Sequence, residues 1–353
     1  MIVMIKVVLN NDILGRIVEI ERLRERCRVI KLPVKLSLKL RKNSKKKSSY
    51  ASNKIEGNPL SEAAAGEAID SSKRHFLKPE QEVRNYYAAL LFLEKALKDK
   101  REFSRELILD VQRLVVRGEA AEKTGIRGPM PPGVLFAVYD EATGRPDYIP
   151  PESMDIEPLL VELVDYVRSS DDHPILKAAV VHYQMVTIHP FEDGNGRTAR
   201  LLSAYVLDYY GYGFSNLGSL EEYFAYDVDE YYRSLQMDLP PLFYDGRCNP
   251  PHPEIWTGYF LRMMELYARK VVEIAEEHTA DKTAASLSHL GLKERRFFKY
   301  LKSRNVVDFT PAEMAKVMKV SNRTIINWCA ELARVGLVEP EIVGQRIRSY
   351  KLA

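Results

Sequence analysis

Apolar side chains recur every three to four residues along most of this chain, the spacing that gives an α-helix one buried face. The pattern extends over residues 80–117, where Ser104 is placed as a helix N-cap. Pro174 suits the first turn of a later helix. The other segments that predict helices are 155–168, 174–188, 198–210 and 254–278. We therefore expect a mainly α-helical protein.

Residues 125–150 depart from the helical pattern. VLFAVY is a short run of β-formers, ATGRP is a turn, and DYI follows before a double proline. Two extended segments joined by a turn favour a β-hairpin, which we predict over residues 134–149.

The composition changes again near the C-terminal end. Residues 279–292 are rich in Thr, Ala, Ser and Gly and are interpreted as a linker. Three helical units follow, in which Thr310 and Ser321 are N-caps and Gly336 is a C-cap. Because the last residues, IVGQRIRSYKLA, favour a β-wing, we predict a winged helix-turn-helix domain over residues 293–353.

Length and charge limit the class of protein. A chain of 353 residues is too long for one small core, and a net charge of +3 argues against a global polyelectrolyte role. The basic stretch at residues 36–47 favours a solvated segment beside a helix over a nucleic-acid arm. The three cysteines, Cys27, Cys248 and Cys329, are far apart, which favours a reducing compartment. No apolar run approaches the roughly 20 residues that span a bilayer, and the N-terminus is a poor signal peptide, so we expect a cytoplasmic protein with no membrane contact.

Residues 189–200, HPFEDGNGRTAR, interrupt two predicted helices with a dense set of polar groups. We expect Gly194 and Gly196 to take positive φ and to let the backbone approach a ligand closely, in a loop that leads into a helix starting near Arg197. Unpaired N–H groups at a helix N-terminus attract anions, so this loop is predicted to bind phosphate. Arg197 and Arg200 share a helix face and would bind further phosphate oxygens.

Two other side chains of this segment indicate chemistry. Asp193 is a hard oxygen ligand placed for Mg²⁺, which would bridge the phosphates. His189 ends the preceding helix, where a neutral imidazole would take a proton from an attacking hydroxyl. A purely structural role is disfavoured, because burying so many charged groups without partners is costly.

The same twelve residues match the H-x-F-x-[DE]-G-N-G-R-x-x-R signature of Fic-domain proteins, and the chain resembles that family over residues 40–275. The resemblance implies a Fic-type helical core that transfers AMP from ATP to a hydroxyl side chain of a protein. It also implies that His189 is the general base and that Phe191 packs inward. The remaining implied roles are the Mg²⁺ ligand Asp193, the α/β-phosphate cradle Gly194, Asn195 and Gly196, and the β/γ-phosphate ligands Arg197 and Arg200.

The hairpin and a later segment extend the resemblance. The hairpin is similar to the family's flap, whose edge strand pairs with the target backbone, and the docking residues would be Val134, Leu135, Phe136, Ala137 and Val138. DEYYRSLQ, residues 229–236, resembles the family's segment near the adenine and implies contacts from Tyr231 and Tyr232. Asp227 and Val228 stand where many members have Asn-Arg. The intact G-N-G-R favours AMP over the UMP or phosphocholine that other members transfer.

A second motif lies before the core. SSYASNKIEGNPL, residues 48–60, matches the family's inhibitory [ST]-x-x-x-E-[GN] motif through Ser52, Glu56 and Gly57. A carboxylate inserted beside Arg200 would compete with the γ-phosphate for the guanidinium. ATP would then bind in a pose unsuited to in-line attack.

These observations predict four regions. Residues 1–105 are an N-terminal helical region with the inhibitory motif, and residues 106–278 are the Fic catalytic core. The linker and the winged domain complete the chain.

We expect an adenylyltransferase that uses Mg²⁺ and ATP and acts on Ser, Thr or Tyr of target proteins and of itself. One alternative is removal of AMP from modified proteins, with Glu56 positioning a water. Another is a DNA-binding regulator whose core only senses nucleotide.

The winged domain holds 13 Lys or Arg against six acids, which fits DNA contact. Its predicted recognition helix offers only Asn322, Arg323 and Asn327 as readers of base edges. Contact with DNA and docking of a protein therefore stay equally open for this domain. The target, the modified residue and the formation of a homodimer stay open as well.

Overall fold

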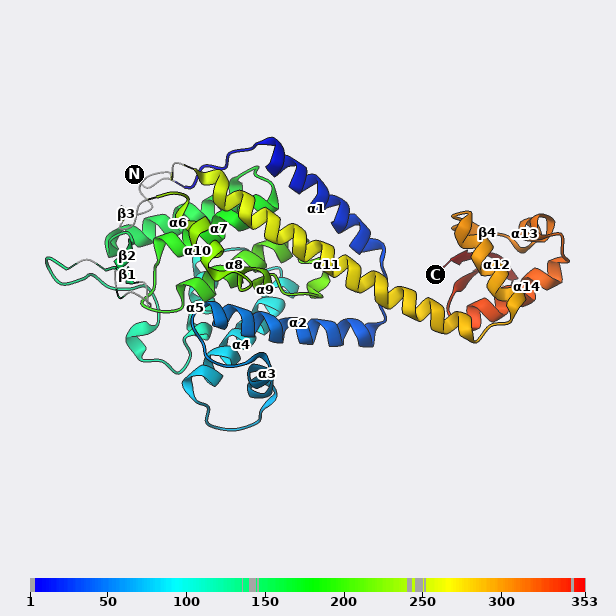
Figure 1. Cartoon of the computed structure of the whole chain (residues 1–353), viewed down its shortest axis with the longest axis horizontal. Helices are drawn as coiled ribbons and strands as arrows, with labels where there is room; N and C mark the ends of the chain where they lie inside the picture. The colour runs from blue at the N-terminus through cyan, green and yellow to red at the C-terminus, as the bar shows by residue number, and fades with distance from the viewer. Residues whose placement is uncertain are drawn as a thin grey trace. The chain divides into compact units, whose positions relative to one another are not determined.

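Figure 1 shows the computed structural model of the chain, which describes residues 4–352 except 135, 140–143, 145, 240–242, 245–249, 251 and 344–345. The chain divides into two compact units. The first comprises residues 1–29 and 33–273, and the second comprises residues 30–32 and 274–353. Both are mainly helical, which confirms the predicted fold class. None of the described helices is long and apolar enough to cross a membrane.

The first unit consists of helices with three short strands. Its elements are α1 (Asn11–Val29), α2 (Val34–Ile55), α3 (Glu62–Asp70), α4 (Lys78–Lys98), α5 (Arg105–Val115), η1 (Ala121–Lys123), β1 (Val138–Tyr139), β2 (Pro146–Ile149), α6 (Ser153–Ser169), α7 (Pro174–Ile188), α8 (Asn195–Tyr209), η2 (Phe214–Asn216), α9 (Glu221–Phe224), α10 (Val228–Gln236), β3 (Phe243–Tyr244) and the first part of the long α11 (Pro253–Ser288), whose residues from 274 on belong to the second unit. In Figure 1, α1 and α11 run side by side, joined by the ion pairs Arg16–Glu265 and Glu19–Arg269.

Helix α7 is the centre of this unit. All but two of its 15 residues are buried, because α8 packs along it and α11 covers it. The hydroxyl of Ser203 on α8 donates to the carbonyl of Ala178 at 3.0 Å, and the indole of Trp256 on α11 donates to Ala179 at 2.8 Å. Helix α7 is therefore packed on two sides and leads from the core of the unit into the residues that follow it.

The basic stretch at residues 36–47 lies within α2. Lys45 pairs with Glu94 on α4, Lys46 with Asp70 at the end of α3, and Lys47 with Glu222 on α9. These lysines therefore hold α2 against its neighbours and do not form an extended nucleic-acid arm.

The predicted hairpin is present as a short antiparallel pair. Val138 of β1 lies opposite Tyr148 of β2, and β3 adds a parallel strand that the sequence pattern did not indicate. Of the predicted docking residues, Val134 is 49% exposed, whereas Leu135 lies outside the described residues.

Residues 279–288, predicted as the first part of a linker, are helical instead and continue α11 to Ser288. The prediction rested on small and polar residues, but this stretch contains neither Gly nor Pro and has several alanines. Nothing therefore stops the i→i−4 hydrogen bonds before Gly291.

The second unit contains the predicted helices and strands near the C-terminal end. They are α12 (Leu292–Ser303), β4 (Asp308–Phe309), α13 (Pro311–Met318), α14 (Asn322–Arg334), β5 (Val338–Val343) and β6 (Arg346–Leu352). The side chains of Thr310 and Ser321 cap α13 and α14 as expected. The sheet order β4-β6-β5 closes over a core that includes Phe297, Ile325 and Tyr350. The assignment of this unit as a winged helix-turn-helix stays a prediction.

Candidate active site

The segment 189–194 connects α7 to α8 through two left-handed residues. His189 ends α7 with φ 47°, and Gly194 caps α8 with φ 82°. A Cβ at Gly194 would lie 3.0 Å from Val115 on α5, so glycine is needed both for φ and for space. Helix α8 starts at Asn195, two residues earlier than predicted, and Gly196 lies inside it. The expected positive φ is therefore right for Gly194 and wrong for Gly196.

The early start of α8 follows from the side chain of Asn195. Its amide nitrogen donates to the carbonyl of Phe191 at 2.8 Å, and the N–H of Phe191 donates back to its oxygen at 3.0 Å. These two bonds close the loop, while the ring of Phe191 is fully buried beneath it. Asn195 therefore braces the loop from inside.

The N-terminus of α8 presents backbone N–H groups to the mouth of this loop. The first N–H groups of a helix have no intrahelical acceptor, and here they belong to Asn195, Gly196 and Arg197. The Arg197 side chain is 7% exposed. Its Nε has no hydrogen-bond partner among the described residues, and a phosphate oxygen would satisfy such a donor. The arrangement suits an anion.

His189 is held in a defined tautomer at the same mouth. Its Nδ1 lies 3.2 Å from the carbonyl of Val186, which can only accept, so Nδ1 carries the proton and Nε2 the lone pair. Burial, with a smaller contribution from Arg127, lowers the pKa of His189 to about 4. The imidazole is therefore neutral near pH 7 and can accept a proton.

Arg127 ties the hairpin to the loop and was not identified from the sequence. Its Nε donates to the carbonyl of His189 at 2.8 Å, and its backbone N–H donates to Pro190 at 2.9 Å. Its guanidinium lies 4.5 Å from the ring centre of Phe136. One arginine of the GIRGP segment thus fixes both the end of α7 and a predicted docking residue, and no local pattern distinguishes it.

Asp193 is neutralised by two cations. Arg197 Nη2 lies 2.8 Å from its Oδ1, and Lys123 Nζ, for which the sequence pattern held no signal, lies 3.2 Å from its Oδ2. Burial acts to raise the pKa of Asp193, but Arg197 and Lys123 hold it below its usual value. Among the described residues, no three His, Cys, Asp or Glu side chains converge as a metal cluster. A magnesium ion that arrives with phosphates needs only one or two protein carboxylates, so the carboxylate of Asp193 fits that ion.

Arg200 joins the predicted inhibitory motif to the loop that is predicted to bind phosphate. The guanidinium donates from Nε to Ser52 Oγ at 2.8 Å and from Nη2 to the Ser52 carbonyl at 3.0 Å. Its Nη2 also pairs with Glu56 Oε1 at 2.5 Å. A Cβ added at Gly196 would lie 2.5 Å from that same carboxylate oxygen. Glycine at 196 thus leaves room for Glu56, and Gly57 ends the motif with φ 78°.

A second buried contact holds α2, the helix that contains most of the predicted inhibitory motif. The Ser48 hydroxyl, one turn before Ser52, donates to Glu221 Oε2 at 2.8 Å. Glu221 on α9 is 4% exposed and also accepts hydrogen bonds from Tyr86 and Ser219. The sequence held no signal for this buried acid.

The two tyrosines assigned to the adenine differ in exposure. Tyr231 is 1% exposed, and its hydroxyl oxygen lies 3.3 Å from Arg200 Nη1 and 2.8 Å from His182 Nε2. Its ring is therefore unavailable to a base in this structure, which corrects the expected adenine contact. Tyr232 is 48% exposed and keeps that role as a prediction.

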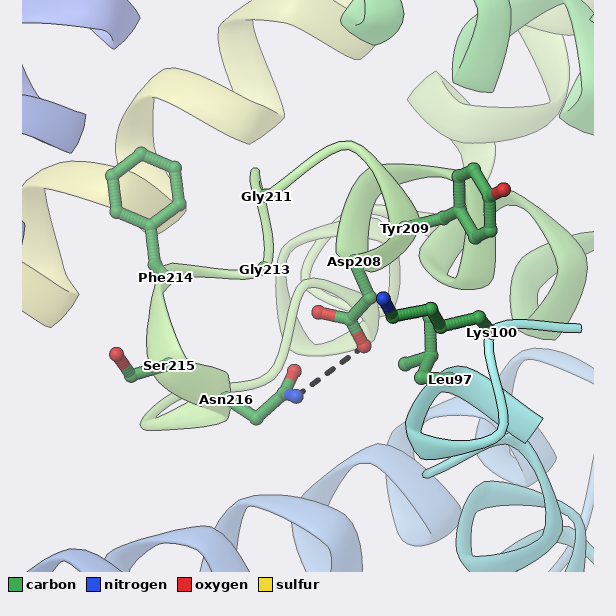
Figure 2. Close-up of a pocket in the computed structure, with 9 residues that line it drawn as sticks. All are labelled: Leu97, Lys100, Asp208, Tyr209, Gly211, Gly213, Phe214, Ser215 and Asn216. Atoms are coloured by element: carbon green, nitrogen blue, oxygen red, sulfur yellow. Dashed lines mark hydrogen bonds between the residues drawn. The ribbon is translucent and has the colours of Figure 1, made fainter. Parts of the chain in front are cut away.

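A hollow of about 650 Å³ lies at the other end of α8, away from the phosphate loop (Figure 2). Asp208 and Asn216 line it and are hydrogen-bonded at 3.3 Å. None of the site residues predicted from the sequence lines this hollow. We therefore do not assign it to nucleotide binding.

Comparisons with known proteins agree on one family. Residues 102–207, which run from just before α5 through most of α8, match the Fic/DOC family. Protein adenylyltransferase Fic of Nematostella vectensis is 31% identical over 165 residues, 45% of this chain and 36% of that protein. Protein adenylyltransferase fic-1 of Caenorhabditis elegans is 34% identical over 157 residues, 42% of this chain and 28% of that protein. The matched region thus spans about a third of these relatives.

A solved structure resembles the fold along nearly the whole chain. A Fic family protein from Desulfovibrio desulfuricans G20 superimposes with a TM-score of 0.62 at 19% identity, covering 99% of this chain and 98% of the other. The motif loop, its N-cap glycine and both arginines lie inside the matched family segment. Residues 102–207 of this chain therefore form a Fic domain of the Fic/DOC family.

Proposed function

We propose that the chain transfers AMP from ATP to a Ser, Thr or Tyr hydroxyl of target proteins and of itself. The observation that carries the proposal is the arrangement of groups at the mouth of the loop. There a neutral His189 with its lone pair on Nε2 lies at the same end of α7 as an open helix N-terminus with an unpaired Arg197 donor. A base beside a phosphate site is what nucleotidyl transfer to a hydroxyl requires.

In this reaction the target oxygen attacks the α-phosphorus of ATP. The new O–P bond forms as the bond from the α-phosphorus to the bridging oxygen of the β-phosphate breaks, and pyrophosphate leaves. The hydroxyl proton passes to Nε2 of His189. The N–H groups of Asn195 and Gly196, together with Arg197 and Arg200, bind the phosphate oxygens and fix their orientation.

Asp193 would hold the Mg²⁺ that accompanies ATP. The ion supplies charge neutralisation to the phosphates when it is bound. Lys123 and Arg197 already pair with the two carboxylate oxygens of Asp193, so the ion would compete with them for this carboxylate.

The target protein would lie along the hairpin. Val134 and Ala137 belong to its first side, and Tyr139 at the end of β1 is 58% exposed. The hairpin lies close to His189, since the ring centres of Phe136 and His189 are 6.0 Å apart. A target segment that pairs with this edge would therefore bring its hydroxyl toward His189.

Glu56 would restrain this activity. It occupies the guanidinium of Arg200 that the γ-phosphate needs, and Ser52 binds the same group twice more. A γ-phosphate that cannot reach Arg200 leaves ATP in a pose unsuited to in-line attack.

Removal of AMP by the same site is the second candidate. Glu56 is 31% exposed beside the loop mouth, so its carboxylate can also orient a water toward a modified side chain. Loss of labelled AMP from a premodified target, measured with and without Glu56, distinguishes this activity from transfer.

The second unit would contact DNA or a protein through α14. Asn322, Arg323 and Asn327 are exposed on this helix. A gel shift on random duplex that weakens steeply with salt would favour DNA. A band that does not move at low salt would favour protein docking.

The test of the main proposal uses labelled ATP with a cell lysate, followed by identification of the labelled proteins. His189→Ala should abolish labelling, a loss on the order of 10²- to 10⁴-fold, while ATP binding stays close to that of the unmodified protein. Labelling by His189→Ala at a near normal rate would remove His189 from the mechanism.

A further inference from the structure

A buried polar chain continues inward from Arg200. Its Nη1 lies 3.3 Å from the Tyr231 hydroxyl oxygen, which lies 2.8 Å from Nε2 of His182. All three side chains are at most 2% exposed. The far end of the chain is enclosed by apolar rings, since the centres of Phe224, Trp256 and Phe260 lie 4.8 to 6.2 Å from the imidazole. The His182 end of the chain is therefore shielded from bulk solvent.

The direction of the hydrogen bonds follows from the chemistry of the groups. A guanidinium only donates, so the Tyr231 oxygen accepts from Arg200 and has its own proton to give to His182. Burial, together with nearby Arg200, holds the pKa of His182 well below its usual value, so the ring is neutral and Nε2 can accept. The ring proton is then on Nδ1.

His182 is an unfavourable choice for a residue that only fills the core. Nδ1 is buried and has no hydrogen-bond partner among the described residues, and a buried unpaired polar group costs stability. Leucine or phenylalanine would fill similar space without that cost. A benefit from Nε2 toward Tyr231 explains why the imidazole is kept.

The partners of Arg200 come from two sides. Ser52 lies on the inhibitory helix α2 and Glu56 caps it, whereas Tyr231 lies on α10. Within the described hydrogen bonds, Tyr231 is thus the partner of Arg200 that remains when the inhibitory segment withdraws. A guanidinium held at Nη1 keeps Nη2 directed toward the position that Glu56 now occupies.

We propose that Tyr231 and His182 are positioning residues that aim Arg200 at the γ-phosphate and thereby set a preference for ATP over ADP. ADP lacks the γ-phosphate, so aiming Arg200 at that group favours ATP. The inference rests on the proposed function, because it takes the γ-phosphate as the group that replaces Glu56.

The test measures binding of ATP and ADP by calorimetry in a Glu56→Gly background, where Arg200 is released. Tyr231→Phe should reduce the ratio of ATP to ADP affinity by roughly tenfold, as expected for one lost hydrogen bond to a charged group, and should leave ADP affinity unchanged. His182→Leu should act in the same direction, while His182→Gln, which keeps a polar group near Nε2, should restore most of the ratio.

Tyr205→Phe is the matched control. Tyr205 is a buried tyrosine on α8 whose hydroxyl donates to the carbonyl of Arg101 and not to Arg200 or His182. An equal drop in the ratio of ATP to ADP affinity for Tyr205→Phe would mean that the effect comes from general packing, and it would overturn the inference. Unchanged ratios for both Tyr231→Phe and His182→Leu would overturn it as well.

Arg200→Ala separates this inference from the proposed function. If Arg200→Ala leaves the ratio of ATP to ADP affinity unchanged, the γ-phosphate assignment itself fails. If Arg200→Ala lowers the ratio but Tyr231→Phe does not, only the positioning role fails. Should His182→Leu not fold, as judged by thermal unfolding, the comparison of Tyr231→Phe with Tyr205→Phe decides.

Discussion

Replacing Glu56 by glycine should accelerate AMP transfer, including self-modification. Arg200 Nη2 lies 2.5 Å from Glu56 Oε1, and the side chains of Arg200 and Glu56 are 1% and 31% exposed. Two unit charges about 4 Å apart at an effective dielectric constant near 20 attract by about 4 kcal/mol. Partial exposure of Glu56 reduces this value, and we take about 2–3 kcal/mol, which corresponds to roughly 30- to 150-fold in a competition with the γ-phosphate.

The assay compares initial labelling rates at saturating Mg-ATP in a double-mutant cycle. Glu56→Gly is measured alone and in an Arg200→Ala background, where it should add little because its partner is gone. Glu67→Ala, which removes an exposed acid from α3, is the control for loss of a surface charge. Lysine at position 56 would be a poorer probe, because its ammonium would itself attract the phosphates.

Two results would refute the reasoning. If Glu56→Gly labels no faster than the unmodified protein, residues 48–60 are an ordinary helix end. An equal acceleration with and without Arg200 would mean that the glutamate acts elsewhere. Faster labelling accompanied by loss of AMP removal would favour the bifunctional alternative.

Three further predictions concern His189, the inhibitory helix and the metal. Burial lowers the pKa of His189 to about 4, so its neutral form persists as pH falls through 6.5. The value of kcat/KM for transfer should therefore decline only near pH 4, and an inflection near pH 6.5 would contradict this prediction. Ser48→Ala removes the hydrogen bond to Glu221 and should raise the labelling rate severalfold. Ser49→Ala is the control, because the Ser49 hydroxyl bonds to Lys45 within the same helix, and it should not raise the rate. Equal rates for the two variants would mean that Glu221 does not anchor α2. Lys123→Met should increase the affinity for Mn²⁺, measured by spin resonance, because the lysine no longer competes for Asp193. Asp193→Ala should abolish Mn²⁺ binding. An unchanged affinity in Lys123→Met would mean that the lysine does not compete.

Features that depend on neighbours in the chain could be predicted from the sequence. Gly194 takes the left-handed conformation because the turn into α8 requires it, and Ser104 caps α5 through the N–H of Leu107. The hydroxyls of Thr310 and Ser321 do the same for α13 and α14. In each case the interacting groups lie within a few residues, so the local sequence contains both partners.

The tertiary structure alone decided which polar groups are buried and paired. Ser48 and Glu221 are 173 positions apart, and Lys123 and Asp193 are 70 apart. Serines, lysines and acids of this kind occur on any protein surface, so their types carry no signal of such pairing. Tyr231 turned inward for the same reason, since either of two adjacent tyrosines on α10 could have faced the core.

Gly196 combines both kinds of information. The loop pattern identified it correctly as a position that needs glycine, but the predicted reasons were a positive φ and close approach of a ligand. Its φ is ordinary, and the space that a Cβ would fill is occupied by the carboxylate of Glu56. Local sequence can specify a conformation, whereas the demand for space is made by a residue 140 positions away and becomes visible only when the two segments pack together.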